Sequence, residues 1–400
     1  MKFAHITDCH LGSWHAKLQE MNLAAFKKAI DECILEKVDF VLITGDLFDV
    51  AMPPIDILKE ATGKLKELKD AGIECYIIAG SHDFSVSGKT FLDVLEKAGL
   101  MQNVSIIKEN DGKIDLEVIE NKNILIAGIS GKKAGMEIPM INKEIVSLEN
   151  KNKNKFKILA LHTTITEAIN DSNPGGSKFM DSVSASKLPE GFDYYALGHI
   201  HSYFEKNIDG KLIVYPGPLF PNNFAEMKTL KAGNFCIVSV SDDKKIKIEK
   251  RKIDLNVEIL DIDASGKEPH QLTKEIIDRI EPLKDKIITL KISGEIKGNT
   301  SEIPFVRINE EAEKNGCMLL KNTSDLENPE FKTEFEIKET DIENIEHEII
   351  KKVSDENLSE FNKLIPILMK SLNIEKQEGE TTLTYEKRLA QDIEKIIGIT

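Results

Sequence analysis

Residue types that bind metal ions follow short apolar segments at five places in this chain. These residues are Asp8 and His10 in ITDCHLG, Asp46 in ITGDLF, Ser81, His82 and Asp83 in IIAGSHDF, His162 in ILALHTT, and His199 and His201 in YALGHIHS. Each preceding segment is rich in β-branched and aromatic residues, which is typical of a buried strand. Because open α/β sheets bind ligands beyond the carboxyl ends of their strands, this pattern predicts a metal-dependent active site.

The spacing and chemistry of the set favour phosphoester hydrolysis. Asp8 and His10 are two residues apart, so at a strand end both side chains point to one side. A carboxylate such as Asp46 can bridge two ions, and mixed imidazole and carboxylate ligands suit manganese, iron or zinc better than calcium. Two ions about 3.5–4 Å apart generate hydroxide near neutral pH and stabilise the attacking and leaving oxygens, which phosphoester hydrolysis needs most.

Taken singly, several histidines and aspartates have simpler interpretations. His162 alone could be a satisfied core or surface histidine, and Asp46 alone could open a turn through its side chain. Their joint placement after five apolar segments favours the metal site. His5, inside the first predicted strand, is expected to be structural, whereas His15 could face a substrate or lie on the surface.

The elements that must position these residues alternate between strand and helix. Strands are predicted over 3–7, 38–44 and 74–79, with helices over 23–36 and 55–71 between them. Shorter strands are predicted over 104–107, 114–119, 124–129, 157–161, 194–197, 211–215 and 234–239. This order predicts a layered α/β core rather than a simple doubly wound sheet.

Two further parts follow this core, so the predicted domains are 1–245, 253–325 and 326–400. The middle part shows strand patterns and a helix over 268–280, which Ser265 is expected to cap. The last part is polar and charged, with apolar stripes at helical spacing. These stripes could pack on their own domain, but so small a tail buries little core alone, which favours docking of a partner helix or coiled coil.

Composition limits the partner and the compartment. The 400 residues are 41% hydrophobic and 30% charged, which indicates a soluble globular protein. No apolar stretch approaches the roughly 18 residues that span a bilayer, and the five cysteines are widely spaced, so we expect a cytoplasmic protein with reduced thiols. The net charge of −15 argues against a nucleic-acid partner, although residues 1–240 hold 27 Lys+Arg against 32 Asp+Glu, a net of only −5.

As an ordered set, the motifs resemble the calcineurin-like metallophosphoesterase superfamily. The motifs are DxH at 8–10, GDxxD at 45–49, GxHD at 80–83, a later single histidine, and GHxH at 198–201. More narrowly, ITDCHLG, ITGDLFD, YYALGHIH and VYPGPL resemble the archaeal double-strand-break repair nucleases of the SbcD type. This resemblance implies a layered α/β/β/α sandwich, a small α/β capping domain and a helical C-terminal tail.

The resemblance also implies a role for each residue of the set. One of two manganese ions would be held by Asp8, His10, Asp46 and His201, and the other by Asp46, His162 and His199. Ser81 stands where the family usually has an asparagine ligand, so it would reach the second ion directly or through water. His82 would be a catalytic histidine that protonates or orients groups at the scissile phosphate.

The implied activity is that of a manganese-dependent 3′–5′ exonuclease and single-strand endonuclease acting on DNA ends. The implied partners are a coiled-coil ABC-type ATPase of the SbcC type, bound through the C-terminal helices, and a second copy of the chain, with no membrane. A nucleoid-associated location follows. Two other functions stay open: a phosphodiesterase for small nucleotides, which would not need residues 253–400, and a DNA-end-binding scaffold whose catalysis is weakened at Ser81.

Overall fold

The computed structural model contains two compact units, Met1–Glu327 and Asn328–Thr400. The residues that it describes are 1–14, 16–85, 90–110, 113–143, 154–172, 181–328, 364–372 and 382–397. His15 lies outside these residues.

The first of two six-stranded sheets has the strand order β14-β13-β1-β2-β3-β4. Its strands are β1 (Lys2–Ile6), β2 (Phe40–Thr44), β3 (Glu74–Ile78), β4 (Gln102–Asn103), β13 (Ala232–Val240) and β14 (Ile246–Asp254). The strands β1, β2 and β3 are parallel neighbours, so their carboxyl ends meet at one edge of the sheet.

The second sheet has the order β11-β12-β10-β9-β8-β7. Its strands are β7 (Ile119–Asn121), β8 (Ile124–Ile129), β9 (Phe156–His162), β10 (Tyr194–Gly198), β11 (Phe204–Ile208) and β12 (Lys211–Tyr215). Here β8, β9, β10 and β12 run parallel. A separate antiparallel pair is formed by β5 (Ile107–Asn110) and β6 (Lys113–Leu116).

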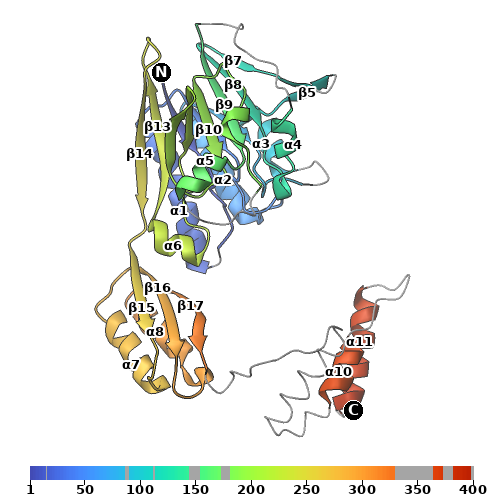
Figure 1. Cartoon of the computed structure of the whole chain (residues 1–400), viewed down its shortest axis with the longest axis vertical. Helices are drawn as coiled ribbons and strands as arrows, with labels where there is room; N and C mark the ends of the chain where they lie inside the picture. The colour runs from blue at the N-terminus through green and yellow to red at the C-terminus, as the bar shows by residue number, and fades with distance from the viewer. Residues whose placement is uncertain are drawn as a thin grey trace. The chain divides into compact units, whose positions relative to one another are not determined.

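The two sheets pack face to face, and helices cover their outer faces (Figure 1). Side chains alternate along each strand: Phe3 of β1 lies between the sheets, where its ring stacks on Phe40 with centroids 4.9 Å apart, while Ala4 and Ile6 pack toward the helices. The helices are α1 (Ala16–Leu35), α2 (Ile55–Asp70) and α3 (Phe91–Lys97) on the first sheet, with α4 (Ile138–Ile141) and α5 (Thr166–Ser172) on the second. The predicted layered α/β/β/α sandwich is confirmed.

Residues 257–327 form a small α/β unit with its own apolar core. Its parallel sheet has the order β15-β16-β17, made of β15 (Val257–Asp263), β16 (Ile287–Glu295) and β17 (Met318–Glu327), with α7 (Pro269–Ile280) and α8 (Phe305–Lys314). The predicted cap at Ser265 is wrong, because Glu268 is the cap and bonds reciprocally with Gln271, while the Ser265 hydroxyl donates to Asp263.

Beyond residue 328, the structure describes α10 (Ile365–Leu372) and α11 (Thr382–Ile397), which contact each other. One of the apolar stripes predicted in the last part, with Tyr385, Leu389, Ile393 and Ile396, lies on α11. No helix among the described residues is both long and apolar enough to span a membrane.

The predicted strand over 104–107 is wrong, because only Ile107 belongs to a strand. The apolar side chain of Val104 fills the core instead: it is fully buried between the sheets, and its backbone N–H donates to the Ile77 carbonyl. The strands β4, β7, β11 and β14 and the short helices α3, α4, α5 and α6 (Phe224–Leu230) were not predicted. Most other predicted strands differ from the observed ones by one or two residues.

His5 is structural, as expected. It is fully buried on β1, where Nδ1 lies 3.0 Å from the Tyr194 hydroxyl and Nε2 lies 2.9 Å from the Thr44 hydroxyl. Burial lowers the pKa of His5 to about 3, so the imidazole is neutral. Its two hydrogen bonds join β1 to β2 of its own sheet and to β10 of the facing sheet.

We predict that Gly198→Ala destabilises the sandwich, because the close approach of the two sheets needs a glycine at the end of β10. A Cβ at this position would lie 2.1 Å from both the Thr44 carbonyl oxygen and the Thr7 hydroxyl. The free energy of unfolding should fall by about 1–3 kcal/mol in chemical denaturation. As a control, Gly63→Ala, in open space within α2, should raise it by about 0.5–1 kcal/mol. Equal stability of Gly198→Ala and the unmodified chain would contradict the close packing.

Candidate metal centre

The structure brings all eight predicted site residues together at the carboxyl ends of the central strands. Ligand atoms lie within 4.8 Å of one another in three overlapping groups: Asp8, His10 and His201; His10, Asp46 and His82; and Asp46, His162 and His199. The Ser81 hydroxyl lies 3.5 Å from the carboxylate of Asp46. We call these eight residues the strand-end cluster.

Four residues of the strand-end cluster have a left-handed backbone, which is uncommon for residues other than glycine. Their φ angles are 48° at Asp8, 41° at His10, 50° at Asp46 and 92° at His199. The loops after β1 and β2 hold this conformation through two hydrogen bonds, from the Asp8 N–H to the Gly45 carbonyl and from the His10 N–H to the Asp46 carbonyl. Strained backbone of this kind is characteristic of functional sites, where the surrounding structure enforces it.

Glycines allow the side chains of the cluster to lie directly against the backbone. A Cβ on Gly45 would lie 2.1 Å from Nδ1 of His162, and one on Gly80 would lie 2.1 Å from the Asp46 carboxylate. A Cβ on Gly131, just after β8, would lie 2.6 Å from the ring of His162. The side chains of His162 and Asp46 therefore pack directly against backbone at these three positions, where any residue larger than glycine would clash with them.

Three histidines of the cluster are held through Nδ1 by an oxygen outside the cluster. The distances are 3.1 Å from His10 to the Asp49 carboxylate, 2.8 Å from His162 to the Thr44 carbonyl, and 3.1 Å from His201 to the Glu226 carboxylate. Metal-binding histidines characteristically use the second ring nitrogen in this way, which fixes the tautomer and the ring orientation. Nε2 of each ring then faces the interior of the cluster.

The inward-facing Nε2 atoms of these rings are suited to bind positive ions. Nε2 of His162 is buried without a hydrogen bond, although it lies 3.2 Å from the carboxylate of Asp46. Nε2 of His10 and Nε2 of His201 face each other at 3.2 Å, and in neutral rings held through Nδ1–H both would be acceptors. A cation shared by such atoms satisfies them all, and this donor set suits manganese, iron or zinc.

The charges of the cluster are strongly coupled. Burial would raise the pKa of Asp8, but the hydrogen bond and charge of His201 outweigh burial and lower it to about 2. Burial alone would lower the pKa of both His162 and His201, yet the neighbouring carboxylates raise these values to about 9 and about 10. Without a metal, protonated imidazoles at His162 and His201 therefore offset part of the charge of the buried carboxylates.

His82 lies at the open side of the cluster, with a side chain that is 45% exposed. Its backbone N–H donates to the Asp46 carboxylate at 2.8 Å, and Nδ1 of its ring lies 2.7 Å from the Asp49 carbonyl oxygen. The ring stands edge-on to that of His10, with centroids 4.7 Å apart. Its Nε2 is thus available to a group outside the protein.

Three carboxylates support the cluster in ways that were not predicted from the sequence, although Asp83 and Asp49 stand in the quoted motifs. Asp83 is buried and accepts backbone N–H groups of Leu47, Phe48 and Gly80, so it joins the loops after β2 and β3. The Asp49 carboxylate contacts Nδ1 of His10, and the Glu226 carboxylate contacts Nδ1 of His201. Asp49 is the last residue of the GDxxD motif, and Glu226 stands three residues after Asn223, a spacing that indicates a helix cap.

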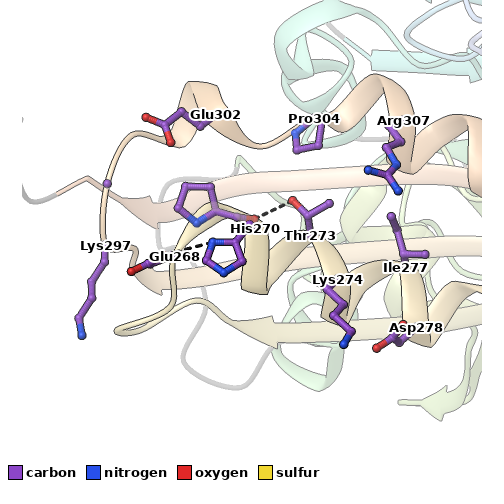
Figure 2. A pocket seen from close by; sticks show the side chains of 12 residues that line it. Glu268, His270, Thr273, Lys274, Ile277, Asp278, Lys297, Glu302, Pro304 and Arg307 are labelled. Carbon is purple, nitrogen blue, oxygen red and sulfur yellow. Dashed lines mark hydrogen bonds and ion pairs between the residues drawn. The ribbon is translucent and has the colours of Figure 1, made fainter.

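A cavity of about 780 Å³ in the small α/β unit is separate from the cluster (Figure 2). Its lining comes from α7, α8 and the segment between β16 and α8, and includes Lys274, Lys297 and Arg307. His270 also lines it and pairs with Glu268 at 3.2 Å, with an exposed side chain. No residue of the strand-end cluster lines this cavity.

Comparison with known proteins identifies the family. Residues 1–203, which contain the whole cluster, match the calcineurin-like phosphoesterase family. The DNA double-strand break repair protein Mre11 of Methanocaldococcus jannaschii is 30% identical over 74% of this chain and 78% of the relative. The chain belongs to the calcineurin-like phosphoesterases and, within them, to the Mre11 family.

Other members of the Mre11 family match over still more of their length. The Archaeoglobus fulgidus protein is 28% identical over 84% of this chain and 80% of the relative. The Sulfolobus acidocaldarius protein is 25% identical over 100% of this chain and 99% of the relative. Membership in this family makes the chain a metal-dependent phosphodiesterase.

We predict that metal binding by this phosphodiesterase releases protons. A protonated imidazole cannot bind a metal, and the pKa values of His162 and His201 are raised to about 9 and about 10. Affinity for Mn²⁺ should therefore rise with pH between about 6 and 9, by up to about 100-fold per pH unit while two protons are displaced. Calorimetry in two buffers with different ionisation enthalpies counts these protons. Affinity that does not change with pH would contradict the prediction.

Proposed function

We propose that this chain is a manganese-dependent nuclease that processes the ends of DNA double-strand breaks, as a 3′–5′ exonuclease and single-strand endonuclease. The observation that carries the proposal is a pair of ligand groups that share Asp46, in a chain that spans 78–99% of three relatives named for double-strand break repair. A carboxylate shared by two groups is suited to hold two metal ions close together, and two such ions promote in-line hydrolysis of a phosphodiester.

The proposed ligands are the group of Asp8, His10 and His201 with Asp46 added, and the group of Asp46, His162 and His199. One Mn²⁺ is assigned to Asp8, His10, Asp46 and His201, and the other to Asp46, His162 and His199. When bound, the ions supply an ionised water near neutral pH and positive charge for the reacting phosphate. Ser81 lies close enough to Asp46 to donate its hydroxyl to that carboxylate, which supports a contact with the second ion through water.

His82 is proposed as the catalytic histidine. Because the Asp49 carbonyl oxygen accepts the proton on Nδ1, the exposed Nε2 is left to hold or release a proton. A protonated Nε2 can donate to the leaving oxygen of the scissile phosphodiester. This role needs no direct bond between His82 and an ion, although its ring lies beside His10.

A loop with two lysines beside His162 is proposed to contact the phosphates of DNA. Within the described part of the chain, neither Lys132 nor Lys133 pairs with a carboxylate. Buried Glu137 anchors this loop, because it accepts the Lys132 N–H at 3.1 Å and the Thr163 hydroxyl at 2.9 Å. The loop that carries both lysines is thereby held next to His162, which Gly131 of the same loop approaches closely.

The proposed assembly follows from the family and from apolar side chains left exposed. The tail helices, which show Ile367 and Leu372 at 52% and 51% exposure, are assigned to a coiled-coil ABC-type ATPase. A homodimer is proposed, and the exposed Val50, Met52 and Ile55, at and just before the start of α2, are available to it. The small α/β unit is proposed to act as a capping domain over DNA, in a cytoplasmic, nucleoid-associated enzyme.

The purified chain with Mn²⁺ should degrade linear duplex DNA from its ends. The test compares end-labelled duplex DNA with a generic aryl phosphodiester, and Asp46→Asn serves as the inactive control. Hydrolysis of the small diester alone would indicate a phosphodiesterase for small nucleotides. Binding of DNA without any hydrolysis would indicate a scaffold, and either result would contradict the proposal.

His82→Ala should separate binding from cleavage. Cleavage of DNA should fall by about 10²–10⁴-fold, the usual contribution of a general acid or base, while DNA affinity changes little. Both quantities can be measured on one labelled duplex by gel assay and by fluorescence anisotropy. His270→Ala, at an exposed histidine of the small α/β unit, should alter neither. A parallel loss of binding and cleavage in His82→Ala would instead make His82 structural.

A further inference from the structure

The short helix α6 lies between the two-sheet sandwich and the small α/β unit (Figure 1). Its cap is Asn223, whose side chain accepts the Glu226 N–H at 2.9 Å. The Glu226 carboxylate in turn accepts the Asn222 N–H at 2.8 Å. These reciprocal bonds hold the Glu226 side chain at the start of the helix.

From this position the Glu226 carboxylate holds His201, at 3.1 Å from Nδ1. The side chains of Glu226 and His201 are only 22% and 21% exposed, so water competes little for this contact. On the opposite side of the ring, Nε2 of His201 lies 3.7 Å from Asp8 and 3.2 Å from Nε2 of His10. The orientation of His201 within the cluster is therefore set by a residue of α6.

Two residues after Glu226, α6 is fastened to the small α/β unit. Nζ of Lys228 lies 2.8 Å from each carboxylate oxygen of Asp261 on β15. Met227, between the two anchors, is fully buried in the same apolar cluster as Ile287 of β16. The helix contacts β15, β16 and β17, so its seven residues touch every strand of the small sheet and, through Glu226, a residue of the cluster.

We propose that α6 couples the position of the small α/β unit to the orientation of His201. Glu226 is the positioning residue, and the Lys228–Asp261 ion pair attaches the helix to the small α/β unit. The inference rests on the proposed metal role of His201. A shift of the small α/β unit pulls on α6 through Lys228 and the buried Met227, and the Glu226 carboxylate moves with the helix. Because coupling between sites is reciprocal, an ion bound at His201 also restrains the small α/β unit.

Mn²⁺ binding to the metal-free full chain tests the proposal, measured by calorimetry for four proteins. Glu226→Gln should weaken one of the two binding events by about 10–100-fold, the usual effect of losing a partner that orients a ligand. Lys228→Ala should weaken the same event by about two- to fivefold, since an exposed ion pair contributes modestly. Lys291→Ala is the matched control, because it removes an ion pair of 2.7 Å with Asp325 inside the small α/β unit without touching α6.

The outcomes separate positioning from simple stabilisation. Glu226→Gln that melts earlier without metal but keeps the Mn²⁺ affinity of the unmodified chain would overturn the positioning role. Lys228→Ala that binds Mn²⁺ as Lys291→Ala does would overturn the link to the small α/β unit. Weaker Mn²⁺ binding in both variants and unchanged binding in Lys291→Ala would support it.

Amide hydrogen exchange of the unmodified chain is a second test that needs no variant. Saturating Mn²⁺ should slow exchange over Phe224–Leu230 and over Val257–Asp263. Mn²⁺ that binds without slowing exchange in either segment would overturn the proposal. Failure to cleave DNA with normal Mn²⁺ binding would count against the proposed function alone, whereas absence of Mn²⁺ binding would overturn both.

Discussion

The carboxylate of Asp46 is the interaction on which the rest of the site depends. It follows β2 of the first sheet, yet it lies 3.2 Å from Nε2 of His162 on β9 of the second. It also accepts the N–H of His82 and lies within reach of the Ser81 hydroxyl. A single side chain thus joins both sheets and both ligand groups. The left-handed backbone at Asp46, with φ of 50°, is what directs it there.

The residues of the cluster could be predicted from the sequence because each lies at or just after the end of a strand that is apolar through burial in the core. The roles of their supporting carboxylates could not, since Asp83 accepts two N–H groups some 35 residues earlier in the chain, and Glu226 contacts a ring 25 residues earlier. The layers were predictable from the alternation of strands and helices. The error at Val104 has the opposite cause: an apolar residue that fills the core need not pair in a sheet.

Part of the acidic charge counted in the sequence is buried in the folded protein. Asp8, Asp46 and Asp83 are almost completely buried, so their charge is directed inward. Protonated imidazoles at His162 and His201 offset part of it, and cations would replace those protons. Three of the acidic side chains counted in the formal charge of −15 therefore lie in the interior rather than on the surface that a substrate meets.

Anomalous diffraction from crystals grown with Mn²⁺ tests the central claim, that one carboxylate serves two metal ions. The account predicts two anomalous peaks about 3.5–4 Å apart, each within bonding distance of the Asp46 carboxylate. One peak should also contact His201, and the other His162. A single peak at saturating Mn²⁺, or two peaks that do not share Asp46, would contradict the account.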